Sequence, residues 1–151
     1  MKKVHFIFID IGLGKLNENI LYMNNIKILK KLNPDIIIKI WNENELDELI
    51  INNYPEYLKL WNSFPSKFYK IDFSRYLILK LHGGFYLDLD MTCLKKLPNE
   101  NKMDFLNIYI SHKNIKTFNN NIIYFRDKNI YNELINFSIE RYNNNKMPKS
   151  W

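Results

Sequence analysis

One continuous segment, from Asp72 to Asp90, restricts the possible folds of this chain more than any other. It opens with an acid and an arginine one helical turn apart, and it reaches the glycine pair Gly83-Gly84. A short apolar run then leads to two aspartates separated by one residue. Glycine ends helices readily because it tolerates positive φ, and the run after it is typical of a buried strand. The segment therefore predicts a helix, a sharp turn and a strand with Asp88 and Asp90 at its carboxyl end.

The N-terminal part predicts the opening of a parallel sheet. Apolar runs at 4–9 and 36–41 flank a segment, 19–32, whose apolar residues recur with helical spacing. Strand, helix and strand in this order form the unit from which parallel α/β sheets are built. We therefore expect an α/β fold with a mostly parallel central sheet flanked by helices. Because no linker divides the chain, residues 1–151 are expected to form a single domain.

Weaker patterns complete the predicted order of elements. Short helices are expected at 45–51 and 54–61, a long helix at 66–82, strands at 85–89, 105–110 and 121–125, and a last helix at 130–142. The apolar side of the long helix is expected to consist of Phe68, Tyr69, Tyr76, Leu77 and Leu81. The asparagine runs 119–121 and 143–145 are interpreted as polar loops.

Composition argues against several classes of protein. The hydrophobic fraction of 46% is typical of a folded globular chain. The most apolar N-terminal run contains His5 and Asp10 and is too short for a membrane span, so no transmembrane segment is expected. A single cysteine, Cys93, excludes an internal disulfide and suits a cytoplasmic location. The charge of +6 is spread along the chain without a nucleic-acid-binding motif, so no nucleic-acid partner is expected.

Asp88 and Asp90 are candidate metal ligands. If the strand stays regular to its end, the two side chains point to the same face. Paired carboxylates suit Mn²⁺ or Mg²⁺, which complete their shells with water and substrate phosphate oxygens. In open α/β sheets, ligands bind at the carboxyl ends of the strands. Taken alone, the pair is equally compatible with a solvated strand end.

Asp72 and Arg75 add a second candidate pair. Their spacing places them on one face of the predicted helix, where an ordinary surface ion pair is the plain interpretation. The glycine turn, however, brings this helix directly to the carboxylate strand. Arg75 can then bind a phosphate or hydroxyl oxygen, and Asp72 can accept hydrogen bonds from sugar hydroxyls.

These motifs together resemble the DXD region of glycosyltransferase family 32, a group that includes α-mannosyltransferases and resembles the large glucosylating toxins. The resemblance covers residues 4–98 well and the segment 121–142 more loosely. The segments that carry it are Val4-His5-Phe6-Ile7-Phe8, Tyr57-Leu58-Lys59-Leu60-Trp61, Asp72-x-x-Arg75-Tyr76, Gly83-Gly84-Phe85-Tyr86 and Asp88-Leu89-Asp90.

The resemblance implies a GT-A (Rossmann-like) fold that binds a UDP- or GDP-linked sugar through Mn²⁺ or Mg²⁺ and transfers a hexose, with retention, to a glycan, lipid or protein acceptor. Family members usually continue past the last predicted helix, so the fold is expected to be incomplete at the C-terminus. By position, the resemblance implies that Asp90 binds the metal and that Asp88 contacts the metal's shell or the donor sugar. The remaining implied donor contacts are Asp72, Arg75, Tyr86 and Phe8, the last of which stands where the family has a base-stacking tryptophan.

Two alternatives remain at the level of sequence. The run from Phe85 to Thr92 also fits the first motif of a haloacid-dehalogenase-like phosphatase, with Asp88 as nucleophile and Asp90 as general acid. That interpretation leaves Asp72 and Arg75 without a role. The other alternative is a non-catalytic domain that binds nucleotide-sugar or accompanies a complete enzyme.

Overall fold

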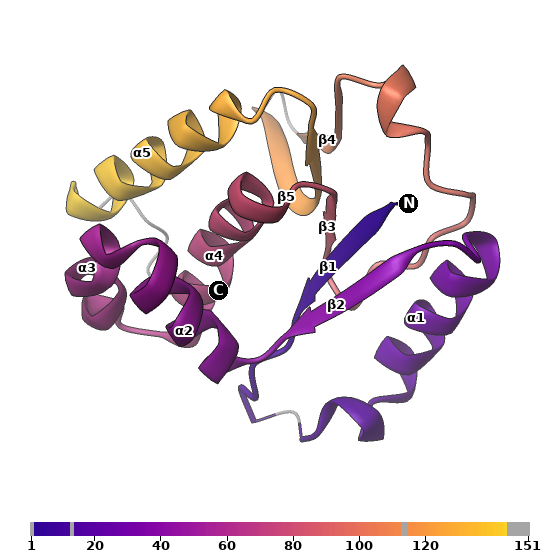
Figure 1. Ribbon diagram of the computed structural model, residues 1–151, viewed down its shortest axis with the longest axis horizontal. Helices are drawn as coiled ribbons and strands as arrows, with labels where there is room; N and C mark the ends of the chain where they lie inside the picture. The colour runs from indigo at the N-terminus through magenta and orange to yellow at the C-terminus, as the bar shows by residue number, and fades with distance from the viewer. Residues whose placement is uncertain (1, 13, 113–114, 145–151) are drawn as a thin grey trace.

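The computed structural model describes residues 2–12, 14–112 and 115–144, which form an α/β fold (Figure 1). The strands are β1 (Lys3–Ile7), β2 (Ile37–Trp41), β3 (Phe85–Leu87), β4 (Phe105–His112) and β5 (Ile115–Phe125). The helices are α1 (Ile20–Leu32), α2 (Glu43–Asn53), α3 (Leu58–Ser63), α4 (Lys67–His82) and α5 (Asn129–Asn143). Short 3-10 helices lie at η1 (Leu16–Glu18), η2 (Pro55–Tyr57) and η3 (Glu100–Lys102).

The five strands form one sheet in the order β2-β1-β3-β5-β4. β1 pairs in parallel with β2 on one side and with β3 on the other. β5 runs antiparallel to β3, and β4 antiparallel to β5, with an irregular register next to Asn107. The expectation of an α/β Rossmann-like sheet is confirmed, but the sheet is evenly mixed rather than mostly parallel. The reason is that β4 and β5 pair directly as antiparallel neighbours, without the crossover helix that a parallel pair needs.

The sheet carries a separate hydrophobic core on each face. Figure 1 shows α1 on one side of the sheet and α2, α3, α4 and α5 on the other. Alternation along β3 serves both cores: Phe85 and Leu87 pack on the side of α1, and Tyr86 packs on the side of α4. Trp61 and Tyr131, both 1% exposed, belong to the larger core under the four helices.

Local signals explain where the first helices begin. The Asn19 side chain accepts a hydrogen bond from the backbone N–H of Tyr22 and caps α1. Asn42 and Glu45 form a reciprocal capping box at the start of α2. Because Asn42 directly follows β2, the chain turns from strand to helix within one residue.

The predicted elements are all present, but three details of the prediction are wrong. β3 ends at Leu87 instead of continuing to 89, so the following aspartates lie in a turn. Phe68 and Leu81 are 38% and 40% exposed, because the middle of α4 is buried nearly all round and its ends are not. The asparagine run 119–121 lies in β5 instead of a loop, because pairing with β4 and β3 satisfies its backbone. The second run, 143–145, extends beyond the described residues.

The turn between α4 and β3 depends on two glycines with positive φ. Gly83 has φ of 67° and Gly84 has φ of 83°. A Cβ atom on Gly84 would lie 2.6 Å from the carbonyl oxygen of Lys3, which belongs to β1. The close approach lets β3 pair with β1 immediately after the turn.

His5 links this turn to the first two strands. It is 4% exposed, its Nδ1 accepts a hydrogen bond from the Trp41 indole at 3.2 Å, and its Nε2 lies 3.0 Å from the carbonyl oxygen of Gly83. Since Nδ1 accepts, Nε2 carries the proton and donates to Gly83. Burial lowers the pKa of His5 to about 4.

Within residues 2–12, 14–112 and 115–144, no helix is long and apolar enough to cross a bilayer. The cytoplasmic location stays a prediction, because the fold does not report a compartment.

Gly84→Ala is expected to destabilise the fold by about 2 kcal/mol or more, because the variant adds a clash with the Lys3 backbone to the strain of positive φ. Gly12→Ala is the control: Gly12 also has positive φ, at 95°, but no atom lies within 4 Å of its added Cβ. Urea denaturation measures the loss of stability in both variants. Equal losses in the two variants would contradict the role assigned to the close approach.

His5 is expected to make the fold sensitive to acid. Its folded pKa lies below the unfolded value, so the unfolded chain takes up the proton first as the pH falls. The neutral, buried His5 therefore contributes to the free energy of unfolding above pH 6.5. This contribution, on the order of 3 kcal/mol in total, is lost as the pH falls to about 4. Denaturation curves at pH 7 and pH 4.5 should show that His5→Gln is less pH-dependent than the wild type. His82→Gln, which alters an exposed ring beside His5, should keep most of the wild-type pH dependence.

Candidate functional site

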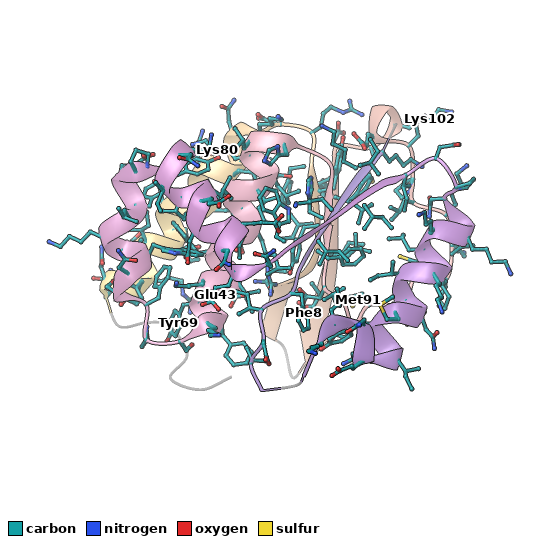
Figure 2. The ribbon with its side chains drawn as sticks, turned by 60° about the horizontal axis from the view of Figure 1, so that its bottom comes forward. Phe8, Glu43, Tyr69, Lys80, Met91 and Lys102 are labelled. Atoms are coloured by element: carbon teal, nitrogen blue, oxygen red, sulfur yellow. The ribbon has the colours of Figure 1, made fainter. Side chains whose placement is uncertain are left out.

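The predicted site residues gather at the carboxyl end of the parallel strands. Phe8 directly follows β1, and its backbone N–H donates to the carbonyl oxygen of Trp41 at 2.8 Å. Asp88 and Asp90 follow β3 in a turn whose backbone is closed by a hydrogen bond from Met91 to Asp88. Figure 2 shows Phe8 and Met91 at this end of the sheet, opposite the end that holds Lys80 and Lys102. The expected position at the carboxyl edge is thus confirmed, although a turn, not the strand, carries the carboxylates.

Arg75 is the centre of the site. Its side chain is 8% exposed, and its Nη2 lies 2.9 Å from Asp72 Oδ1 and 3.4 Å from Asp88 Oδ1. Its Nη1 donates to the backbone carbonyl oxygen of Asn120 at 2.9 Å. One guanidinium therefore connects α4, the turn after β3 and strand β5. The plain interpretation of Asp72 and Arg75 as an exposed surface pair is wrong, because both side chains are largely buried.

Tyr86 completes the surroundings of Asp88. Its hydroxyl donates to Asp88 Oδ1 at 2.6 Å, and its ring lies 5.0 Å from the Arg75 guanidinium carbon. The ring is 1% exposed. Asp88 Oδ1 is therefore held by two neighbours, which orients the carboxylate at the end of the strand.

Burial dominates the electrostatics of the two inner carboxylates. It raises the pKa of Asp72 and of Asp88 above the ordinary value, and Arg75 lowers each pKa only in part. Asp90 adds a further like charge that raises the pKa of Asp88. Three carboxylates against one guanidinium leave the cluster with a formal charge of −2.

The donor set fits a divalent cation. Asp90 is exposed and has no hydrogen bond or ion pair to another described residue, so its oxygens are available to a ligand. The formal charge of −2 matches one divalent ion, and carboxylate oxygens are the hard ligands that Mg²⁺ and Mn²⁺ prefer. In the described part of the chain, no three acidic, histidine or cysteine side chains are placed so that they could hold one metal ion together. A cation held by Asp88 and Asp90 would thus complete its shell with water and ligand oxygens.

A cavity of about 150 Å³ opens beside these residues. Of the predicted residues, Phe8, Arg75, Tyr86, Asp88 and Asp90 line it, together with apolar side chains from β1, α1 and α4. Asp72 is the exception. It lines a different cavity and reaches the first one only through its ion pair with Arg75.

Two asparagines belong to the site although sequence patterns did not single them out. The backbone carbonyl oxygen of Asn120 accepts a hydrogen bond from Arg75, and its side-chain amide donates to Asp72 Oδ1 at 3.2 Å. Asn25, 3% exposed on α1, donates to the carbonyl oxygen of Leu89 and accepts from the Thr92 hydroxyl. Asn25 thereby holds the turn that carries the aspartates. The signal in the sequence was an amide pair, Asn24-Asn25, inside the apolar pattern of 19–32.

Comparison with known protein families identifies the chain. The family model described as "Glycosyltransferase sugar-binding region containing DXD motif" matches residues 21–111, more than half of the chain. The chain therefore belongs to this glycosyltransferase family. The match includes α4, the glycine turn and both aspartates.

Individual relatives agree with this assignment. An uncharacterized glycosyltransferase of Acanthamoeba polyphaga mimivirus is 38% identical over 88 residues, which are 58% of this chain and 35% of the relative. Inositol phosphoceramide mannosyltransferase 3 of Schizosaccharomyces pombe is 38% identical over 66 residues, 44% of this chain and 18% of the relative. The chain thus spans about a third or less of the length of these two relatives.

A solved structure shares the fold. The PaToxG glycosyltransferase superposes with a TM-score of 0.63 at 19% identity, over 95% of this chain and 62% of that chain. The expected GT-A, Rossmann-like fold is confirmed. The phosphatase alternative is wrong, since the family match assigns the same strand and aspartates to a glycosyltransferase region.

Arg75→Met is expected to destabilise the fold by about 3 kcal/mol at pH 7, because it leaves Asp72 and Asp88 without their buried partner. The pKa of both carboxyls, already raised by burial, should rise further. The penalty is present while they are ionised and is relieved as the pH falls toward 4 and they take up protons.

Arg126→Met is the matched control, because its pair with Asp104 is exposed and worth less than about 1 kcal/mol. Urea denaturation at pH 7 and pH 4 distinguishes the two variants. A loss for Arg75→Met that does not shrink in acid would contradict the electrostatic origin of the penalty.

Proposed function

We propose that this chain binds a UDP- or GDP-linked sugar through Mn²⁺ or Mg²⁺ and takes part in retaining transfer of a hexose to a glycan, lipid or protein acceptor. The observation that carries the proposal is the meeting of Asp88, Asp90 and Arg75 beside Phe8 at the ligand-binding edge of a GT-A sheet. Membership of a sugar-binding DXD family supports it. We further propose that residues 1–151 act as one domain.

The two aspartates are assigned to the metal and the diphosphate. Asp90, exposed and unpaired among the described residues, is the direct ligand. Asp88, whose Oδ1 is held by Tyr86 and Arg75, adds an oriented carboxylate on the inner side. When bound, the cation neutralises the diphosphate leaving group. The unbalanced charge of −2 supports this assignment.

Arg75 and Asp72 are assigned to the transferred sugar. Arg75 lines the cavity, and its buried Nε has no hydrogen-bond partner among the described residues. A sugar or phosphate oxygen within reach of this guanidinium would use that donor capacity. Asp72 keeps the guanidinium in place from the other side and offers a carboxylate to sugar hydroxyls.

Phe8 is assigned to the base. It lines the cavity on the side of β1, and its backbone is fixed to β2 by the hydrogen bond to Trp41. An aromatic ring at the rim of a cavity offers a face on which a base can stack. Phenylalanine lacks the N–H of a tryptophan, so stacking alone would hold the base.

The proposed transfer breaks the bond between the anomeric carbon and the diphosphate oxygen, which leaves with the electron pair. A bond forms from the same carbon to an acceptor oxygen, whose proton is released. A mannosyl group is one candidate hexose, because the Schizosaccharomyces pombe relative is named a mannosyltransferase. The residues assigned above account for donor binding, and none of them is assigned to the acceptor's proton. A non-catalytic nucleotide-sugar-binding or partner domain is therefore the alternative.

Asp90→Asn is expected to weaken Mn²⁺-dependent binding of UDP-glucose or GDP-mannose by roughly tenfold or more, since even outer-shell changes often cost 10- to 100-fold in metal affinity. Calorimetric titration with Mn²⁺ and with EDTA measures the effect. Asp104→Asn removes the same charge from an exposed site outside the cavity and should leave donor affinity unchanged.

Equal affinity for the donor in wild type and Asp90→Asn would contradict the assigned metal site. Measuring release of the nucleoside diphosphate distinguishes a transferase from a non-catalytic binding domain. Slow metal-dependent hydrolysis of the donor supports the transferase. Binding without turnover, even with acceptors supplied, supports the binding domain.

A further inference from the structure

The turn that carries the two aspartates can adopt more than one backbone conformation. The Met91 N–H donates to the carbonyl oxygen of Asp88 at 3.1 Å, so residues 88–91 form a β-turn with Leu89 and Asp90 at its centre. Types I and II of such a turn differ chiefly in the orientation of the central peptide. A flip of this peptide changes φ of the third residue, here Asp90, by about 170° and redirects its side chain.

Asp90 itself does little to prevent this flip. The flipped form needs a positive φ at the third residue, which aspartate tolerates better than most residues do. The Asp90 side chain is exposed and makes no hydrogen bond or ion pair within the described ranges. The direction of its carboxylate therefore depends on what holds the central peptide from outside the turn.

Asn25 holds the central peptide from α1. Its side-chain amide donates at 2.8 Å to the carbonyl oxygen of Leu89, which belongs to that peptide. Because a carbonyl can only accept, Nδ2 of Asn25 faces Leu89, and Oδ1 accepts from the Thr92 hydroxyl at 2.6 Å. A single side chain thus binds the chain both before and after Asp90.

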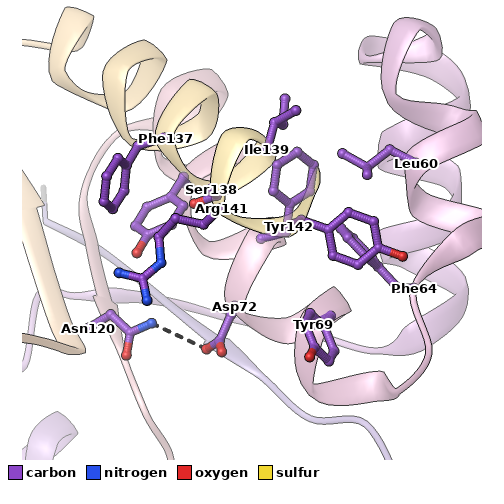
Figure 3. Close-up of a pocket in the computed structure, with 12 residues that line it drawn as sticks. Leu60, Phe64, Tyr69, Asp72, Asn120, Phe137, Ser138, Ile139, Arg141 and Tyr142 are labelled. Atoms are coloured by element: carbon purple, nitrogen blue, oxygen red, sulfur yellow. Dashed lines mark hydrogen bonds between the residues drawn. The ribbon is translucent and has the colours of Figure 1, made fainter. Parts of the chain in front are cut away.

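The two aspartates are held from opposite faces of the sheet. Asp88 is held from the side of α4 by Arg75. Arg75 is fixed in turn by Asp72 and by the backbone of Asn120, and Figure 3 shows the Asn120 amide joined to Asp72. Asp90 is held only through its backbone, and from the side of α1.

Packing alone would favour an apolar residue at position 25. Asn25 is 3% exposed and lies one turn before Leu29, a member of the core on this side of the sheet. Burying an amide is costly unless its polar atoms are paired, and both atoms of this amide are. The hydrogen bonds to the turn are therefore what distinguishes asparagine from an apolar side chain here.

We propose that Asn25 is a positioning residue for the proposed metal ligand Asp90. It fixes the central peptide of the turn and so keeps the Asp90 carboxylate at the donor cavity, which Asp90 lines beside Asp88. Thr92 supports this role by orienting the amide. A ligand group that is already in place loses little freedom when the cation binds, so preorganisation raises affinity. The proposal rests on the proposed function.

Two measurements on the whole chain test the role of Asn25. Hydrogen exchange of the Met91 amide, followed by NMR without metal, should be about two- to tenfold faster in Asn25→Leu, because the turn loses a hydrogen bond that supports it. Affinity for Mn²⁺ in the presence of UDP-glucose or GDP-mannose, measured by EPR, should fall about tenfold or more.

Asn33→Leu is the matched control. Asn33 is 2% exposed at the end of the same helix, accepts from the Leu97 N–H at 2.9 Å and donates to the carbonyl oxygen of Leu29 at 3.0 Å. The variant removes a buried amide of the same kind, so thermal melting should show a comparable loss of stability. Its Mn²⁺ affinity and its Met91 exchange rate should stay close to those of the wild type.

Two substitutions of Thr92 keep the test decisive if Asn25→Leu does not fold. The Thr92 side chain is exposed, so neither substitution disturbs the core. Thr92→Val removes the hydroxyl and should weaken Mn²⁺ binding about two- to tenfold, the effect of one neutral hydrogen bond. Thr92→Ser keeps the hydroxyl and should bind Mn²⁺ like the wild type. Equal affinities in these two variants would count against the proposal.

The outcomes separate the role of Asn25 from the proposed function. Met91 exchange that is equal in the wild type and Asn25→Leu shows that Asn25 does not hold the turn. Faster exchange with unchanged Mn²⁺ affinity overturns the positioning role, and so does an equal loss of affinity in Asn33→Leu. A wild type that binds neither Mn²⁺ nor donor overturns the proposed function, and the exchange measurement still decides whether Asn25 holds the turn.

Discussion

The buried Arg75 guanidinium is the interaction on which the arrangement of this site depends. It pairs with Asp72 on its own helix and with Asp88 after β3, and it binds the backbone of β5 at Asn120. Burying a charge is costly unless it is paired and hydrogen-bonded, so these partners hold one another in place. The same contacts bring a helix, a parallel strand and an antiparallel strand to one point. What looks like a stabilising ion pair is also the boundary between two cavities.

The site also carries an excess of negative charge that no other group of the described structure neutralises. Burial keeps the pKa of two carboxyls raised, and a third carboxylate lies exposed beside them. Natural proteins retain such unfavourable charge where a ligand compensates for it. Membership of a DXD sugar-binding family supplies a chemical reason for the imbalance.

Much of this arrangement could be predicted from local patterns. The spacing of Asp72 and Arg75, the glycine pair and the apolar run each act through near neighbours in the chain, so the helix, the turn and the strand were all predicted. Asn120 could not be predicted, because its role arises only when β5 pairs with β3 and passes Arg75. The early end of β3 was not predicted either: after the backbone N–H of Asp88 binds the carbonyl oxygen of Asn121, the chain enters the turn closed by the hydrogen bond from Met91 to Asp88. Long-range pairing of this kind leaves no periodic signal in the sequence.

The contact between Gly84 and Lys3 has a consequence for how this chain can vary. The gap between the turn and β1 is filled by the backbone and the Cβ atom of Lys3, with no room for a methyl group on Gly84. The approach of the turn to the first strand is therefore set by a direct contact of Gly84 with Lys3 rather than by the packing of long side chains. Substitutions among the apolar residues that line the cavities can change the shape of the cavities without moving the carboxylates. In this chain, the placement of the carboxylates and the lining of the cavities are encoded by different atoms.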